Sequence, residues 1–228
     1  MTTVTRDFPQ FKPMPTHASV YAKDFSFTVI NSHTAAVSTL HEQGVGSPTA
    51  TRTTREGDIV APRETFSFSV PIGWSGRLAV YEEGFDIGGR GTLLEGSHFL
   101  GANHTPSMAL DVSYVDAFTV PMVCECNNIV AFGCNLNLND VCPKHLQGNA
   151  KTCFNPYRDQ PGKPGPNNIF RDCETMAYTY PTDDLATKVD IPGCHDSVTC
   201  CIGTACKHHP GQKKCPAKDG HVRPCAGL

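Results

Sequence analysis

Twelve cysteines lie between Cys124 and Cys225 of this 228-residue chain, and the first 123 residues contain none. An even number of cysteines confined to one stretch favours disulfide pairing, which forms and persists in oxidising compartments. We therefore predict that all of them are cross-linked. The predicted disulfide cysteines are Cys124, Cys126, Cys134, Cys142, Cys153, Cys173, Cys194, Cys200, Cys201, Cys206, Cys215 and Cys225.

A metal-binding tail is the alternative explanation of these cysteines. The stretch "CCIGTACKHHPGQKKC" mixes cysteines with His208 and His209. It lacks the paired C-x-x-C spacing of zinc knuckles, and adjacent Cys200 and Cys201 suit two divergent disulfides better. We predict disulfides and no metal site.

The disulfide prediction also bears on localisation and partners. Residues 1 to 17, "MTTVTRDFPQFKPMPTH", contain no apolar core of a signal peptide, so we expect a secreted protein whose signal peptide is absent from this sequence. With a net charge of −3 and no basic stripe, we expect no nucleic-acid partner. No apolar run approaches the roughly 20 residues of a membrane span. We also expect no cofactor and a monomer.

The N-terminal half predicts β-structure. Apolar and polar residues alternate in "KDFSFTVINS" and "ETFSFSVPIGW", and "GRLAVYEEG" and "GTLLEGSHFL" are further short candidates separated by glycine-rich turns. Residues 41 to 58 are expected to form a polar loop. Several short strands with frequent turns indicate a sandwich or barrel.

The chain changes character at Cys124. We expect a short helix near the end of "NNIVAFGCNLNLNDVCPKHLQ", a Pro/Gly loop at 155–168 and one strand within "IFRDCETMAYTYPTDD". The last 35 residues are too rich in Cys, Gly, Pro and Lys to form an apolar core, so we expect cross-links to order them. The expected organisation is an N-terminal extension (1–17), a β-sandwich core (18–123, continuing to about 194) and a cysteine-rich lobe with a tail (124–228).

The stretch "DVSYVDAFTVPM", residues 111 to 122, places two aspartates in an apparent strand. Positions five apart fall on opposite faces of an unbroken strand. Either one aspartate faces water, or the chain bends and both line one site; the spacing alone leaves both open. Glu95 follows two leucines, and such surroundings raise the pKa of a carboxyl group that acts as a proton donor.

This stretch closely resembles the D-[IV]-S-L-V-D-G-[FY]-N-[LI]-P-M pattern of thaumatin-like proteins of the osmotin or pathogenesis-related 5 type. Further motifs follow in the family's order: "FTVIN", "FDIGGRG" (85–91), "TLLE", "CNLNLNDVCPKHLQ" and "YTYPTDD" (178–184). The resemblance covers about residues 24 to 194. It implies an all-β fold, in which a β-sandwich core and a disulfide-rich loop lobe flank an acidic cleft.

The resemblance also implies the site. The cleft acids of the family fall on Glu95, Asp111, Asp116 and Asp183, which we expect to be the catalytic residues. It follows that the strand at 111–122 should be interrupted, so that both of its aspartates face the cleft. The expected substrate-binding residues are Tyr114, Tyr178 and Arg77, and Trp74 is a further stacking candidate.

The chain also departs from the family pattern. It has fewer cysteines, and "LAVYEEG" replaces the W-G-R-T-x-C stretch that supplies the family's cleft arginine. Arg77 is the nearest candidate for that arginine, one residue out of register. We interpret the chain as a divergent member, fungal or microbial rather than plant.

Three functions are compatible with these residues. The first is a weak endo-β-1,3-glucanase with antifungal activity, in which Glu95 is the general acid and Asp111 or Asp116 the base or nucleophile. The second is a non-catalytic module for glucan or another oligosaccharide, or a defence or effector module; the missing arginine motif favours it. The third is a biosynthetic enzyme that uses the same acids on a small molecule.

Overall fold

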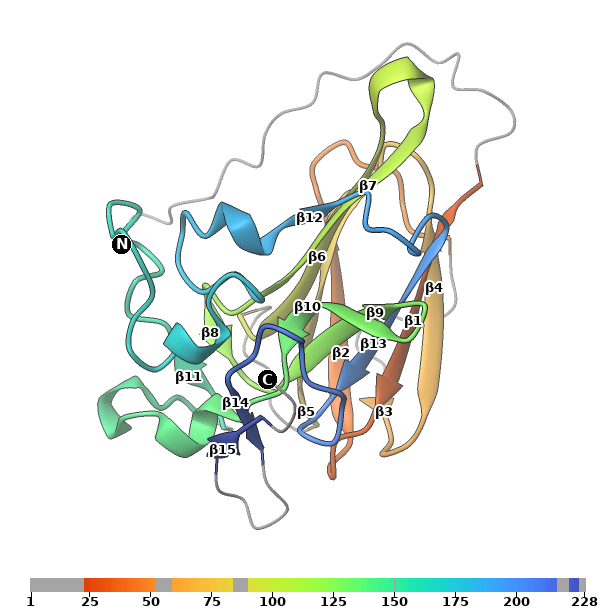
Figure 1. Cartoon of the computed structure of the whole chain (residues 1–228). Coiled ribbons are helices and arrows are strands. Elements are labelled where there is room, and N and C mark those ends of the chain that lie inside the picture. Colours follow the sequence, from red (N-terminus) through yellow and green to blue (C-terminus); the bar gives the residue numbers. More distant parts are fainter. Residues whose placement is uncertain (1–22, 52–58, 84–89, 150, 217–221, 226–228) are drawn as a thin grey trace.

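The computed structural model describes residues 23–51, 59–83, 90–149, 151–216 and 222–225 (Figure 1). Two β-sheets pack face to face, so the predicted all-β sandwich is confirmed. The five-stranded sheet has the order β10 (Ile129–Cys134), β9 (Met122–Cys126), β13 (Ser197–Ile202), β1 (Phe25–Asn31) and β4 (Thr65–Val70). The six-stranded sheet has the order β12 (Lys188–Val189), β7 (Pro106–Ser113), β6 (Thr92–Leu100), β5 (Ser75–Glu82), β2 (Val37–Gln43) and β3 (Ile59–Val60).

Short elements complete the described chain. Two small sheets pair β8 (Ala117–Phe118) with β11 (Cys153–Phe154) and β14 (Lys214–Pro216) with β15 (Val222–Pro224). The helical elements are 3₁₀ turns: η1 (Ala102–His104), η2 (Leu138–Val141), η3 (Lys144–Leu146), η4 (Arg171–Cys173) and η5 (Asp184–Ala186). None of these turns has the length or apolarity of a membrane-spanning helix.

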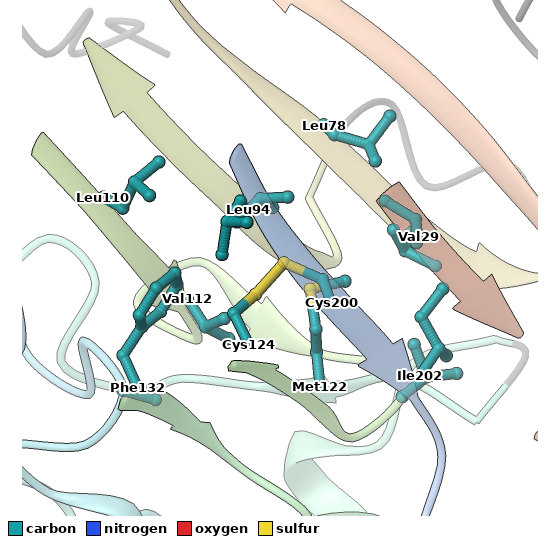
Figure 2. Packing of buried hydrophobic residues seen from close by; sticks show 14 of the residues in the cluster. Val29, Leu78, Leu94, Leu110, Val112, Met122, Cys124, Phe132, Cys200 and Ile202 are labelled. Carbon is teal, nitrogen blue, oxygen red and sulfur yellow. A yellow bond between two sulfur atoms is a disulfide. The ribbon is translucent and has the colours of Figure 1, made fainter. Parts of the chain in front are cut away.

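The core lies between the inner faces of the two main sheets (Figure 2). In β1 the side chains of Phe25, Phe27 and Val29 are buried, while the intervening Ser26 and Thr28 face outward. This is the alternation expected of a strand with one face on a core. Figure 2 shows how leucines of the six-stranded sheet meet residues of β9, β10 and β13; those labelled include Leu78, Leu94, Leu110, Met122, Phe132 and Ile202.

Six disulfides pair all the cysteines, as the sequence predicts. The pairs are Cys124–Cys200, Cys126–Cys194, Cys134–Cys173, Cys142–Cys153, Cys201–Cys206 and Cys215–Cys225. The first joins the adjacent strands β9 and β13 inside the core, where both of its cysteines are 0% exposed. The third and fourth staple the described residues from 135 to 186, which we call the lobe, and which lie beside the sandwich in Figure 1.

The four strands predicted before residue 101 are confirmed as β1, β4, β5 and β6. The strand expected within residues 169–184 is wrong: the described chain forms η4 and η5 there, with an isolated bridge between Ser113 and Tyr178. The expected short helix near residue 140 is a pair of 3₁₀ turns. The polar loop expected from residue 41 begins later, because β2 extends to Gln43.

The C-terminal segment contributes to the core, contrary to the expectation that cross-links alone order it. Strand β13 lies between β9 and β1, and its Val198, Cys200 and Ile202 are at most 2% exposed. The expected division at residue 123/124 falls inside β9. The predicted N-terminal extension and most of the "FDIGGRG" motif lie outside the described residues.

Candidate functional site

A row of charged side chains crosses the outer face of the six-stranded sheet. Residues of four neighbouring strands are direct partners there: Glu42 opposes Arg77, Arg77 opposes Glu95, and Glu95 opposes Asp111. Side chains alternate along a strand, so these residues point away from the core into which Leu78 points. Glu42, Arg77, Glu95 and Asp111 are all partly buried, and we call them the charged row.

Part of the outer face of the six-stranded sheet is covered by another segment of the chain, and the charged row lies at the edge of this covered part. On the same face, Ala79 and Leu93 are at most 2% exposed, whereas Ser97 and Ala109 on the other side of the row are partly exposed. The segment that follows β8 lies against the covered part, since the Thr119 hydroxyl donates to the carbonyl of Val80 (2.5 Å). The charged row therefore lies where the covering segment ends.

The predicted interruption of the 111–122 strand is confirmed. Strand β7 ends at Ser113, and the chain leaves the six-stranded sheet before it forms β8 against β11. The amide of Asn155 donates to the carbonyl of Tyr114 (3.1 Å), and the backbone of Tyr178 pairs with that of Val112 and Tyr114. The bend carries Asp116 back towards the charged row.

Asp116 connects the charged row to the lobe through two guanidinium groups. Its Oδ1 lies 2.9 Å from Nε of Arg158, and its Oδ2 lies 3.8 Å from Nη1 of Arg77. Nε of Arg77 in turn lies 2.5 Å from Oε2 of Glu42. The side chain of Asp116 is only 9% exposed. Opposite charges thus alternate from Glu42 to Arg158, and carboxylates outnumber guanidinium groups once Glu95 and Asp111 are included.

The opposite end of the row meets the edge of the sheet. The hydroxyl of Thr187 donates to Oδ2 of Asp111 (3.2 Å), just before β12 pairs with β7. Tyr178 is partly buried, and its hydroxyl donates to Oδ1 of the exposed Asp184 (2.5 Å). Because Tyr178 bridges to Ser113, two residues after Asp111 and on the same face, it flanks the row on its covered side.

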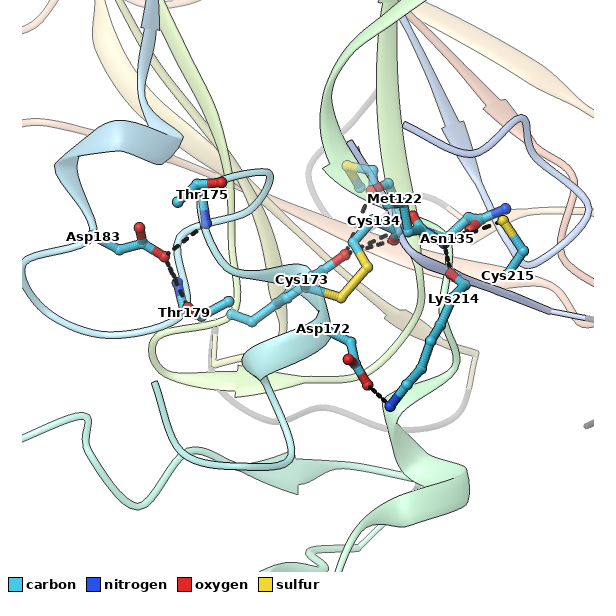
Figure 3. The surroundings of a disulfide bond; sticks show 12 residues. Met122, Cys134, Asn135, Asp172, Cys173, Thr175, Thr179, Asp183, Lys214 and Cys215 are labelled. Carbon is cyan, nitrogen blue, oxygen red and sulfur yellow. Dashed lines mark hydrogen bonds and ion pairs between the residues drawn. A yellow bond between two sulfur atoms is a disulfide. The ribbon is translucent and has the colours of Figure 1, made fainter. Parts of the chain in front are cut away.

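Asp183 lies inside the lobe, close to Thr175 and Thr179 (Figure 3). It is 1% exposed, and its Oδ2 accepts hydrogen bonds from the backbone and hydroxyl of Thr179 (3.1 and 2.8 Å) and from the backbone of Thr175 (3.4 Å). Burial raises the pKa of its carboxyl group, although these hydrogen bonds oppose the shift. Asp183 therefore stabilises a lobe turn, and its hydrogen bonds stay within the lobe.

Two aromatic residues expected to bind a ligand are core residues. Tyr114 is 0% exposed; its ring packs edge-on against Phe118, and its hydroxyl donates to the carbonyl of Cys134 (3.0 Å). Burial raises the pKa of this hydroxyl far above its ordinary value. Trp74 is 4% exposed and packs near Phe27. Neither ring is available to stack on a sugar, whereas the ring of Tyr178 is only partly buried.

Two residues of the arrangement were missed in the sequence. Glu42 fell in the expected polar loop, although the alternation of buried Val37 and Thr39 with outward Leu40 and Glu42 carries the signal of a strand. Arg158 lies in the Pro/Gly loop, where no periodic pattern points to it. Arg77, expected to be out of register with the family's arginine, lies in the charged row itself.

Comparisons with known proteins support the resemblance drawn from the motifs. No protein-family model matches the chain. A pathogenesis-related 5 protein, Jun a 3.0101 of Juniperus ashei, is 31% identical over 106 residues, which cover 40% of this chain and 47% of the relative. The chain therefore spans about half the length of the curated relative it matches.

Among solved structures, the protein elicitor MoHrip2 of Magnaporthe oryzae is similar over 79% of this chain and 98% of its own, at 13% identity and a TM-score of 0.40. This structural similarity is too low to support an inference about function. The sequence match and the disulfide-bonded β-fold both support the suspected relationship.

Proposed function

We propose that this chain, a relative of the thaumatin-like proteins of the pathogenesis-related 5 type, is a secreted defence-type protein that weakly hydrolyses β-1,3-glucan at its charged row. The relationship and the six disulfides support an extracellular defence protein. The observation that carries the proposed hydrolysis is the direct cross-strand pairing of Glu95 with Asp111 at the edge of the covered face.

The spacing of this pair suits glycoside hydrolysis. Directly opposed residues of antiparallel strands have Cβ atoms about 4.5–5.5 Å apart. Retaining glycosidases hold their two carboxyl groups about 5–5.5 Å apart, whereas inverting enzymes need about 6.5–9.5 Å to admit a water molecule. Cβ atoms this close allow the two carboxyl groups to approach to the retaining distance, so we include a retaining mechanism in the proposal.

In this mechanism the two carboxyl groups have different tasks. Protonated Glu95 donates its proton to the glycosidic oxygen, while ionised Asp111 attacks the anomeric carbon and forms the glycosyl intermediate. Glu95 then takes a proton from the water that hydrolyses this intermediate. Asp116 is engaged by two guanidinium groups, so we assign it the binding of sugar hydroxyls together with Arg77 and Tyr178.

A non-catalytic binding module is the second candidate, and the ion pairs of Asp116 favour it. Arg77 and Arg158 neutralise the charge of Asp116 and fix its position beside the charged row. A fixed, partly neutralised carboxylate suits a ligand-binding groove as well as a reaction centre. Such a module binds glucan through the same residues and releases no sugar. The two candidates differ in one measurable quantity, the turnover of bound glucan.

Hydrolysis of laminarin, a soluble β-1,3-glucan, tests the proposal. We expect the wild-type protein to release reducing ends, and Glu95→Gln and Asp111→Asn to lower the rate about 100-fold or more while binding to insoluble β-1,3-glucan is kept. Asp159→Asn, an exposed acid of the lobe, is the matched control and should keep full activity. NMR of the first product should show the retained anomer.

Other outcomes discriminate the candidates. Binding without reducing-end release from the wild-type protein would establish the non-catalytic module. Release that survives Glu95→Gln would contradict the assigned acid, and the inverted anomer would contradict the mechanism. Absence of both binding and release would overturn the proposed function.

A further inference from the structure

An acceptor motif for N-linked glycosylation lies on the hairpin that carries Glu95 and Asp111, and the charged row does not use it. Residues 103–105 read "NHT", which fits the pattern Asn-x-Ser/Thr with a residue other than proline in the middle position. The sequence contains no second triplet of this kind. A motif of three residues also occurs by chance, so its surroundings decide whether Asn103 can be an acceptor.

The motif lies at the tip of the β6–β7 hairpin, in the 3₁₀ turn η1. Ala102 and His104, on either side of Asn103, are exposed, and so are Thr105 and Pro106. Figure 1 shows this yellow-green hairpin projecting beyond the rest of the sandwich, with β8 and β11 toward the other end. In secreted proteins the motif is modified on surface loops, because the transferring enzyme must reach the asparagine. The hairpin tip meets this requirement.

The turn is closed by its own hydrogen bonds rather than by core packing. The backbone amide of Gly101 donates to the carbonyl of Thr105 (2.8 Å), and the Thr105 hydroxyl donates to the carbonyl of Ala102 (3.0 Å). Burial resumes on β7 at Ser107, which is 8% exposed. A bulky group can therefore be attached at this tip without displacing residues of the core.

Pro106 sets the backbone of the residue before it. Proline restricts its preceding residue to extended conformations, and Thr105 has φ −84° and ψ 139°. The chain thereby enters β7, where Pro106 pairs with Leu100 of β6. Pro106 fits the folded hairpin, but it narrows the conformations in which the acceptor segment can meet the transferring enzyme. We therefore expect Pro106 to limit the fraction of chains that are glycosylated rather than to prevent the reaction.

We propose that Asn103 carries an N-linked glycan, an inference that rests on the proposed secretion of the chain. The donor is an oligosaccharide joined to a lipid through pyrophosphate. The side-chain amide nitrogen of Asn103 attacks the anomeric carbon of this donor, the bond from that carbon to the pyrophosphate oxygen breaks, and the lipid pyrophosphate leaves. The amide nitrogen loses one proton, and the transfer needs neither an oxidant nor a reductant.

The glycan is attached at the end of the hairpin that is remote from the charged row. Pro106 begins β7, and Asp111 lies five positions further along the same strand, which corresponds to about 17 Å at about 3.4 Å per residue. The attachment site also lies beyond the part of the sheet that pairs Glu95 with Asp111. Glycosylation at Asn103 therefore leaves the row open to a polysaccharide.

Secretion of the full chain from a eukaryotic host tests this proposal. The chain is directed into the secretory pathway by a signal peptide, purified from the medium and treated with peptide N-glycosidase in heavy-oxygen water. This enzyme releases the glycan and converts the glycosylated asparagine to an aspartate that carries the heavy label. We expect the wild-type protein to lose mass on treatment, and peptide mass spectrometry to locate the label at Asn103.

Variants separate this motif from other sites of attachment. Asn103→Gln and Thr105→Ala should each remove the glycan, because the first deletes the acceptor and the second deletes the hydroxyl of the motif. Thr105→Ser keeps that hydroxyl and should keep the glycan. Asn149→Gln, at an exposed asparagine outside any such motif, is the matched control and should leave the glycan unchanged. Pro106→Ala should raise the glycosylated fraction.

Three results would overturn the proposal. These are secreted wild-type protein without a glycan, a glycan that remains in Asn103→Gln, and a glycan that remains in Thr105→Ala. Laminarin hydrolysis by Asn103→Gln should equal that of the wild type, because the hairpin tip lies beyond the row. Failure of the glycosylation site and failure of the proposed glucan site therefore give different results.

Discussion

Asp183 holds a lobe turn through a buried carboxylate. Its Oδ2 accepts three hydrogen bonds, while its buried Oδ1 has no hydrogen-bond partner among the described residues. Burial raises its pKa above the ordinary value of 3.8, so folding favours the protonated acid. The stability that this group adds is therefore fully present below its unfolded pKa and is lost as the pH rises through the higher folded pKa.

Asp183→Asn removes this titration. As the pH rises from about 3 through the raised pKa, the unfolding free energy of the wild type should fall relative to that of the variant. The difference between them should then level off. Urea denaturation at several pH values measures this difference. Thr182→Ala, an exposed change in the same turn, is the control and should show a constant difference. Parallel curves for wild type and Asp183→Asn would show that the carboxyl group does not titrate with folding.

Strand β13 illustrates what the elements contribute. It is a central strand, parallel to β1 and antiparallel to β9, and the Cys124–Cys200 disulfide fixes it to β9. Its buried residues face the core across the sandwich (Figure 2). The segment after residue 194 therefore does more than carry cross-links.

Ile202→Ala tests that role. Ile202 is 0% exposed, so truncating it should lower the free energy of unfolding by about 2–4 kcal/mol through lost burial and the remaining cavity. Denaturant unfolding with the disulfides intact measures the loss. Val189→Ala, at a side chain 55% exposed on β12, should change stability by less than about 0.5 kcal/mol. A similar small effect at Ile202 would mean that the cross-links order this segment, as the composition first suggested.

The difference between the predicted and observed elements has a physical origin. Strands β1 and β4 alternate large aromatic and small polar residues, so period two is visible in the sequence alone. In β13 two of the six residues are cysteines, whose pairing preference hides the inward alternation of Val198, Cys200 and Ile202. The turns η4 and η5 replace an expected strand because disulfide Cys134–Cys173 and the Asp183 hydrogen bonds fold that segment locally.

The same limit applies to the site. The motifs single out Glu95, Asp111 and Asp116; sheet register explains why the first two are paired, and the bend after β7 brings Asp116 to Arg77. Arg158 carries no local signal, and the strand alternation around Glu42 does not identify its partner, because both contacts depend on packing between distant segments; Glu42 and Arg77 are 35 residues apart. Asp183 matches a family position in sequence, but burial, which a motif does not report, places it in the lobe.

At the scale of the whole molecule, the dependence of binding on salt distinguishes a neutral ligand of the charged row from a cationic one. The chain carries a net charge of −3, and the charged row concentrates carboxylates at the edge of the covered face. A neutral glucan is bound by hydrogen bonds and ring stacking, which salt barely affects. A cationic partner is drawn by long-range attraction, and the distance over which charges act falls from about 30 Å at 0.01 M salt to about 8 Å at 0.15 M.

We therefore expect glucan binding to be nearly independent of ionic strength. Laminarin affinity measured by calorimetry should change less than about twofold between these salt concentrations, because the ligand is uncharged. A short oligolysine peptide measured in parallel reports how strongly the acidic surface attracts cations, and its affinity should fall steeply. Arg77→Ala makes the row more acidic, so it should strengthen peptide binding and weaken that of laminarin, whose hydroxyls lose a donor. If laminarin shows no saturable binding while the peptide binds tightly at 0.15 M, the row is a site for cationic partners, and the defence role then acts through charge rather than through glucan.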